Sequence, residues 1–295
     1  MTDDLDGQLW RPAAGKSRMT ALAAAFRSHP GFALALLLHS LGRTLRLWLF
    51  EKAFRSKDWR AAVRSVRRDG YAIVPGYLTP EEVAFLTGVC DRSAEGSAGL
   101  KGDPYFIATA PGSLRLRHME GRHPEMDYFR RHPKLGMLSV CLYGRPHWPS
   151  VQYAATYDGV SNPPHVAGRA DAPFGGVCHV DQWHHQLKAL FLLEDVRPEN
   201  GPLMLFPGTW RPQWLGFDVY RLKRWNKTHE GPPPPDLAHL RDDNFPPEVC
   251  AEVVRQGAPV PITGKAGDLV LFDARTLHFA GRIEKGRRRL LWFYY

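Results

Sequence analysis

The second half of the chain consists of short runs in which apolar residues are continuous or alternate with polar ones. Gly, Pro, Asn or Asp separates these runs, as turn residues separate strands. The pattern predicts strands at 150–157, 186–196, 202–208, 267–273 and 288–295. Many short strands in succession are typical of an antiparallel sandwich or barrel, so a mainly β fold with flanking helices is expected.

The N-terminal part of the chain has helical spacing instead. Residues 30–55 place leucines and a tryptophan at intervals of three and four, which predicts an amphipathic helix. Arg43, Arg46 and Lys52 interrupt this run and make it too broken for a transmembrane span. Such a helix either packs on the domain or lies in a membrane interface, and the sequence leaves both alternatives open.

The globular body is expected to begin near residue 60. Residues 71–74 predict a short strand, and a helix with a complete start signature follows. Thr79 is placed as the N-cap, Pro80 as the first helical residue, and Glu82 three residues after the cap.

Charge is distributed unevenly along the chain. The net charge is +9, and residues 1–68 contain 13 Lys and Arg against 5 Asp and Glu. A nearly neutral body argues against a nucleic-acid partner. The basic arm either meets an anionic membrane or keeps an exposed helix solvated. We therefore expect a basic extension with an amphipathic helix over residues 1–60 and one domain over residues 61–295.

A Pro- and Trp-rich segment at about 210–258 interrupts the predicted strands and is too long for a simple hairpin loop. It is either a lid over a site or a surface insertion.

The cysteines and the N-terminus favour the cytoplasm. The four cysteines are widely scattered without metal-binding spacing, so reduced thiols are expected. The first 30 residues lack the apolar core of a signal peptide. The expected location is cytoplasmic, with peripheral contact at the inner membrane face through residues 30–55 as the alternative.

The stretch "GGVCHVDQWHHQL" carries the candidate chemistry. Side chains alternate along a strand, so His179 and Asp181 would point to one face and could hold a metal ion between them. His278, just after a separate apolar strand, can supply a third ligand. Two histidines and one carboxylate are the ligand set of non-haem Fe(II) oxygenases.

An oxygenase of this kind needs an electron source, and the usual one is 2-oxoglutarate. The distal carboxylate of 2-oxoglutarate requires a buried cation, which an arginine supplies through a bidentate fork. Arg289 stands eleven residues after His278; Arg287 would share its strand face, whereas Arg288 would point away.

Several motifs in order resemble the phytanoyl-CoA dioxygenase family of Fe(II)/2-oxoglutarate oxygenases. They are "DGYAIVPGYLTPEEVAFL", "HVD", "LFLLEDVRPENGPLMLFPGTW" and "GDLVLFDARTLHFAG", and the resemblance covers about residues 65–295. It implies a double-stranded β-helix, the cupin-like jelly roll. The implied iron ligands are His179, Asp181 and His278, and the implied 2-oxoglutarate contacts are Arg289 and, secondarily, Gln152.

The resemblance also implies an activity. Asp181 fills the position that halogenating relatives leave to a halide, so hydroxylation of an unactivated carbon is expected, with O2 and 2-oxoglutarate converted to succinate and CO2. Desaturation and ring formation stay as alternatives. The expected substrate is a small molecule or lipid-like compound, contacted by Trp183 and His185 unless these are hydrogen-bonded core residues. A non-catalytic binding protein and a peripheral membrane adaptor are the alternatives from other classes.

Overall fold

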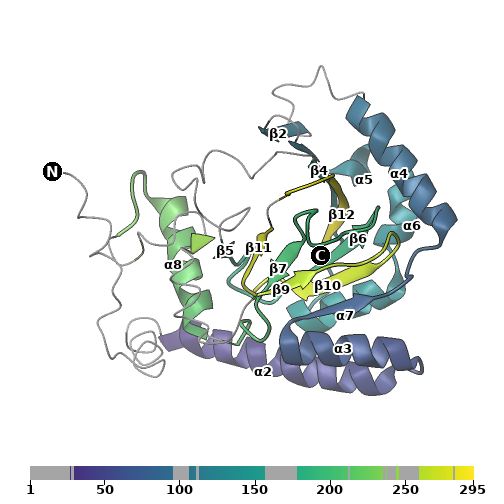
Figure 1. The fold of residues 1–295 in the computed structure, drawn as a ribbon. Helices are drawn as coiled ribbons and strands as arrows, with labels where there is room; N and C mark the ends of the chain where they lie inside the picture. Colours follow the sequence, from purple (N-terminus) through teal and green to yellow (C-terminus); the bar gives the residue numbers. More distant parts are fainter. Residues whose placement is uncertain are drawn as a thin grey trace.

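The computed structural model contains two antiparallel sheets that face each other (Figure 1). It describes residues 27, 30–95, 106–110, 113–156, 178–211, 213–234, 237, 244–245, 259–281 and 283–295. The larger sheet has the strand order β1 (Tyr71–Val74), β10 (Leu269–Asp273), β6 (Leu187–Leu192), β12 (Arg288–Tyr294), β4 (Ser150–Thr156), β3 (Ser113–Leu116) and β2 (Phe106–Ala110). The smaller sheet has the order β8 (Asn244–Phe245), β5 (Cys178–His179), β11 (His278–Ala280), β7 (Leu203–Leu205) and β9 (Val260–Ile262).

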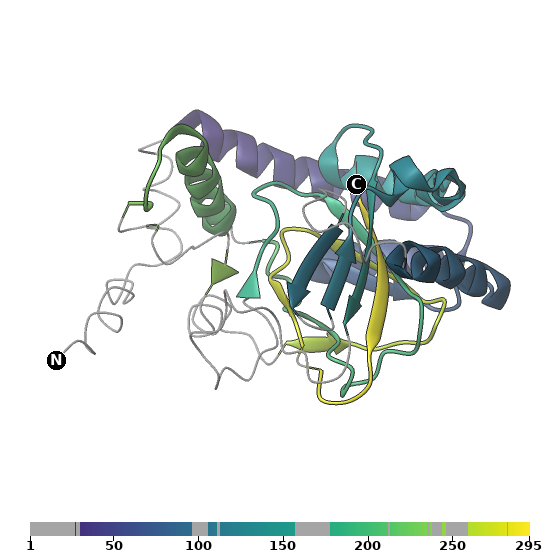
Figure 2. The same cartoon turned by 90° about the horizontal axis from the view of Figure 1, so that it is seen from above.

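Most of the helices lie on the outer side of the larger sheet, whereas the last one, Gln213–Thr228, lies near the edge of the smaller sheet (Figures 1 and 2). The helices are α2 (Pro30–Ala53), α3 (Lys57–Asp69), α4 (Pro80–Glu95), α5 (Met119–Arg122), the 3-10 turn η2 (Pro124–Met126), α6 (Asp127–Arg130), α7 (Pro133–Tyr143) and α8 (Gln213–Thr228). The predicted fold class, a jelly roll with flanking helices, is confirmed.

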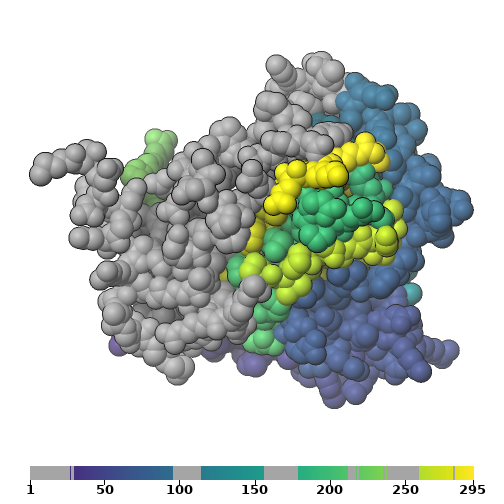
Figure 3. Space-filling model, viewed as in Figure 1, coloured from purple at the N-terminus to yellow at the C-terminus, as the bar shows by residue number. Residues whose placement is uncertain are grey.

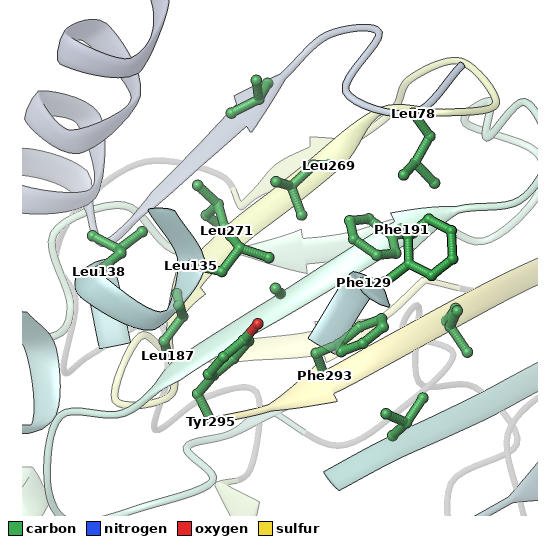
Figure 4. Close-up of a cluster of buried hydrophobic side chains, with 14 of the residues drawn as sticks. Leu78, Phe129, Leu135, Leu138, Leu187, Phe191, Leu269, Leu271, Phe293 and Tyr295 are labelled. Atoms are coloured by element: carbon green, nitrogen blue, oxygen red, sulfur yellow. The ribbon is translucent and has the colours of Figure 1, made fainter. Parts of the chain in front are cut away.

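Two apolar layers hold this arrangement together, one on each face of the larger sheet. The outer layer joins the helices to strand residues such as Phe191, Leu271 and Phe293 (Figure 4). The inner layer lies between the two sheets and includes Leu190 and Phe272. Alternate residues of one strand thus serve different cores.

The predicted helix start is present at α4. The Thr79 amide donates to Glu82 Oε2 at 2.9 Å, and the Glu82 amide donates to Thr79 Oγ1 at 3.2 Å. This reciprocal pair satisfies two amides that the first helical turn leaves without partners.

The helix predicted over residues 30–55 forms as α2. Of the two predicted alternatives, packing on the domain describes one face of this helix. Leu47 is fully buried in the outer core, and Arg43 is fully buried beneath the barrel loops. The predicted extension over residues 1–60 is therefore not separate from the body where it is described, because α2 packs on α3 and α7, and these two helices contact the large sheet.

The predicted insertion at 210–258 contains α8 and the short strand β8 within its described parts. Helix α8 contacts α2, and the rings of Phe32 of α2 and Tyr220 of α8 stack with centroids 3.7 Å apart. Segments 235–236, 238–243 and 246–258 lie outside the described residues, so the lid function stays a prediction.

Candidate metal centre

Three side chains from the smaller sheet and its adjoining loop converge at one point. β5 and β11 pair so that His179 lies directly opposite His278. Asp181 follows β5 by two residues, and its amide donates to the Ala274 carbonyl at 2.9 Å. The potential ligand atoms of His179, Asp181 and His278 all lie within 4.8 Å of one another. The structure thus brings together the three residues that the sequence singled out.

Backbone contacts fix the orientation of these ligands. His278 Nδ1 lies 2.8 Å from the Thr276 carbonyl, which can only accept, so this nitrogen carries the proton. The lone pair of His278 then sits on Nε2, which lies 3.1 Å from Asp181 Oδ2. Holding an imidazole by its remote nitrogen is the usual support for a metal ligand. Lys223 of α8 also donates to the Asp181 carbonyl at 2.7 Å.

Lys188 is a residue at this centre that the sequence interpretation missed. Its Nζ lies 2.6 Å from Asp181 Oδ2, and it is buried on β6. Burial would raise the pKa of Asp181, but the Lys188 ammonium and His278 outweigh it and hold that pKa well below its usual range. Asp181 is therefore a carboxylate, as metal binding requires. A lysine within the apolar run "QLKALFLL" was the available signal.

These donors fit a divalent transition metal. Two imidazoles and one carboxylate meet within the reach of one ion, and three protein ligands are fewer than an octahedral ion takes. The set is of the 2-His-1-carboxylate type that binds non-haem iron. A structural zinc site would instead close all four tetrahedral positions with protein ligands.

The prediction that Arg289 faces this centre is wrong. Arg289 lies on the outer face of β12, where its Nη1 contacts Asp91 of α4 at 2.9 Å and its Nε contacts Glu194 at 3.2 Å. Arg288 lies on the inner face, because it shares its side of the strand with Leu290 of the inner core. Arg289 does lie eleven residues after His278, but the residue of β12 that faces inward is Arg288, one position earlier.

Arg288 has the properties of an anion-binding group. Its side chain is buried, with 8% of the residue exposed, and burial next to Arg115 lowers its pKa to about 10. Among the described residues, no carboxylate pairs with its guanidinium. A buried guanidinium without a protein counter-charge favours an anionic ligand.

Gln152 and Trp183 stay candidates for ligand contact. Gln152 is buried on β4, directly opposite Trp292, and so faces the space between the sheets. Trp183 is half-buried and packs edge-on against Phe32 of α2 at 5.2 Å between ring centroids.

The prediction that His185 contacts substrate is wrong. His185 has no exposed surface, and its Nδ1 and Nε2 lie 2.7 Å from Asp273 Oδ2 and 2.8 Å from Ser40 Oγ. The strand β5 ends at His179, so the alternation that would have turned His185 toward the ligands does not continue. The alternative interpretation, a hydrogen-bonded core histidine, describes this residue.

His185 belongs to a buried polar cluster that supports the loop before His278. Arg43 Nε contacts Asp273 Oδ2 at 2.8 Å, and both side chains are completely buried. Asp273 also accepts from the amide of Arg275 at 3.1 Å. The loop that follows Asp273 carries both backbone carbonyls that orient Asp181 and His278. Helix α2 is thus joined to the metal centre through this cluster.

Comparison with known proteins places the chain in a family. The family model described as phytanoyl-CoA dioxygenase (PhyH) matches residues 66–290. An ectoine dioxygenase of Bordetella parapertussis is 27% identical over 233 residues, covering 73% of this chain and 68% of the relative. An ectoine dioxygenase of Stutzerimonas stutzeri is 25% identical over 252 residues, covering 79% and 75%.

Solved structures show the same fold. EctD from S. alaskensis with 2-oxoglutarate and 5-hydroxyectoine superimposes with a TM-score of 0.55 at 20% identity, covering 80% of this chain and 74% of that one. The α-ketoglutarate dependent carbocyclase SnoK from nogalamycin biosynthesis gives a TM-score of 0.51 at 20% identity, covering 83% and 85%. With the matched family model and the converging His-x-Asp and His ligands, these findings lead to one conclusion: this chain belongs to the phytanoyl-CoA dioxygenase family of non-haem iron and 2-oxoglutarate dioxygenases.

Proposed function

We propose that this protein hydroxylates an unactivated carbon of a small-molecule or lipid-like substrate, with O2 and 2-oxoglutarate converted to succinate and CO2. The observation that carries the proposal is the complete ligand set, with Asp181 ionised beside His179 and His278. Bound iron(II) and 2-oxoglutarate supply the electrons that turn dioxygen into an oxidant of C–H bonds.

The residues of the chain have separate roles in this proposal. His179, Asp181 and His278 would hold the metal, and three protein ligands are fewer than such an ion takes, so 2-oxoglutarate could be a further ligand. Arg288 binds the distal carboxylate of 2-oxoglutarate, because its guanidinium is buried, faces inward and pairs with no carboxylate in the part of the chain that the structure describes. Gln152 is the secondary contact on the same face of the sheet.

An apolar substrate is favoured by the side chains next to Asp181. Trp183, two residues after Asp181, packs against Phe32 and Tyr220, with centroids 5.2 Å and 5.6 Å away, so aromatic rings from α2 and α8 gather around it. Ectoine, for which the matched relatives are named, is the polar small molecule to compare in a substrate screen.

An anaerobic titration with Fe(II) and 2-oxoglutarate tests the cofactor assignment. We expect a weak visible charge-transfer band that needs both additions and is absent in Asp181→Ala. Arg288→Gln should raise the concentration of 2-oxoglutarate needed for the band, whereas the matched control Arg289→Gln should leave it unchanged. A band lost only in the Arg289 variant would reverse the arginine assignment.

Succinate release under air tests the reaction. Candidate acyl compounds and ectoine are each added, and hydroxylated product is sought by mass spectrometry. If one class of compound gives succinate and hydroxylated product in equal amounts, that class contains the substrate. If the charge-transfer band is normal but none of the tested compounds gives a product, the alternative of a binding protein on the same barrel is favoured.

A further inference from the structure

Helix α2 exposes an unusual face. Its residues Leu34, Leu38, Leu41, Leu45, Trp48 and Leu49 have between 45% and 67% of their surface exposed. We call these six residues the α2 apolar face. Their spacing of three and four residues makes them one continuous stripe. Every exposed position of α2 before Lys52 is apolar, so no charge interrupts the stripe.

The opposite face of α2 carries the polar groups. Ser40, Arg43 and Glu51 are all buried against the domain. Glu51 pairs with Arg64 of α3 at 2.8 Å, and Arg43 pairs with Asp273. Rotating the helix to bury its leucines would break both ion pairs. The exposure of the α2 apolar face is therefore fixed by the domain.

A stripe of this size needs a partner. Soluble proteins rarely expose contiguous large apolar patches unless these bind something. The charge of the surrounding segment indicates what that partner is. Residues 27–68 contain ten Lys and Arg and only two Asp and Glu, Glu51 and Asp58. Lys52 lies seven residues after Leu45 and so extends the same stripe, and Arg55 and Lys57 follow it, all exposed.

We propose that the α2 apolar face docks into the interface of an anionic lipid bilayer, with the helix axis parallel to the membrane plane. Leucines and Trp48 would enter the boundary of the acyl chains, while Lys52, Arg55 and Lys57 would contact anionic headgroups. A second copy of the chain fits less well, because the exposed surface of α2 offers no acidic side chain to those cations.

A spanning orientation is inconsistent with the packing. By length and composition α2 is apolar enough to cross a membrane, although its charged residues led us to expect otherwise. Arg43 and Glu51, however, have their partners in the domain on one side of the helix. Only the opposite side is available to lipid. In Figures 1 and 2 the helix runs along an edge of the molecule, and Figure 3 shows the purple N-terminal region at the lower border.

Vesicle flotation of the full chain tests the proposal. We expect binding to phosphatidylcholine vesicles that contain phosphatidylglycerol, little binding to phosphatidylcholine alone, and weaker binding at high salt. The double substitution Leu41→Gln and Leu45→Gln should lower the partition coefficient by about tenfold or more, because two side chains no longer enter the lipid. The matched control is Tyr128→Gln, which changes an apolar residue that is 73% exposed away from α2.

Three outcomes would overturn the proposal. One is a folded full chain that does not bind anionic vesicles. A second is equal binding by the Leu41 and Leu45 variant. The third is a dimer by light scattering that this variant dissociates, which would assign the face to a second copy. The charge-transfer band of the Leu41 and Leu45 variant with iron and 2-oxoglutarate should match that of the wild type. Failure of membrane binding can therefore be distinguished from failure of the proposed activity.

Discussion

Replacement of Arg43 by methionine tests whether α2 supports the catalytic body. Arg43 Nε lies 2.8 Å from Asp273 Oδ2, its Nη2 donates to the Val66 carbonyl at 2.8 Å, and its guanidinium lies 3.8 Å from the centre of the Trp210 ring. Methionine keeps the length of the apolar stem but removes the charge. Asp273 would then remain buried without the guanidinium that contacts its carboxylate.

The expected cost follows from this geometry. Removing one partner of a completely buried ion pair costs about 3–5 kcal/mol of unfolding free energy. Asp273 keeps its contacts with His185 at 2.7 Å and with the Arg275 amide at 3.1 Å, so the lower end of that range is expected. Arg46→Met is the matched control on the same helix. Arg46 donates to backbone carbonyls at a part-buried position, and its loss should cost about 1 kcal/mol.

Urea denaturation followed by circular dichroism measures these changes. In a double-mutant cycle, Arg43→Met and Asp273→Asn should destabilise together by less than the sum of the single effects, because both remove the same pair. Strict additivity, or a loss below about 1 kcal/mol for Arg43→Met, would refute the reasoning. Iron binding should also weaken in the folded variant, because the loop after Asp273 orients Asp181 and His278.

Three further predictions concern stability. Burial lowers the pKa of His184 to about 4 and of His185 to about 3, so both stay neutral in the fold, whereas in the unfolded chain they gain protons below a pH of about 6.5. The unfolding free energy should therefore fall as pH decreases from about 6.5 toward 4, by up to about 1.4 kcal/mol per pH unit for His185, in urea titrations at several pH values. A constant free energy across this window would contradict the buried neutral state. Gly70→Ala should cost about 2 kcal/mol in the same assay, because Gly70 has φ 89° and an added methyl group would meet the side chain of Thr276. An unchanged urea midpoint would show that the αL turn tolerates a side chain. Thr79→Ala should cost about 1 kcal/mol through loss of the N-cap of α4, and Thr79→Ser, which keeps the hydroxyl, should restore most of it.

The structure also changes what truncation should do. If residues 1–60 served only localisation, a chain that begins near residue 60 would keep its chemistry. Such a chain would lack Leu47 of the outer core and Arg43, the buried partner of Asp273. We expect it to be poorly folded, with soluble yield and a thermal melt as the measurements.

The sequence alone determined the parts of this protein that depend on local patterns. Alternating apolar runs predicted the strands, the Thr79 to Glu82 spacing predicted the start of α4, and His179, Asp181 and His278 were found from residue type and order. Each of these depends on side-chain periodicity or on a motif of a few residues, and such signals survive without knowledge of the fold.

Only the tertiary structure decided which way neighbouring residues face and what they meet. A strand that starts one residue earlier or later reverses its faces, which is why Arg288 and not Arg289 lies inside the barrel. His185 became a core residue because the chain leaves strand β5 after His179. The pairing of Arg43 with Asp273 joins positions 230 residues apart, and no local pattern carries such a contact. The same long-range pairing turned the polar side of α2 inward and left the α2 apolar face exposed.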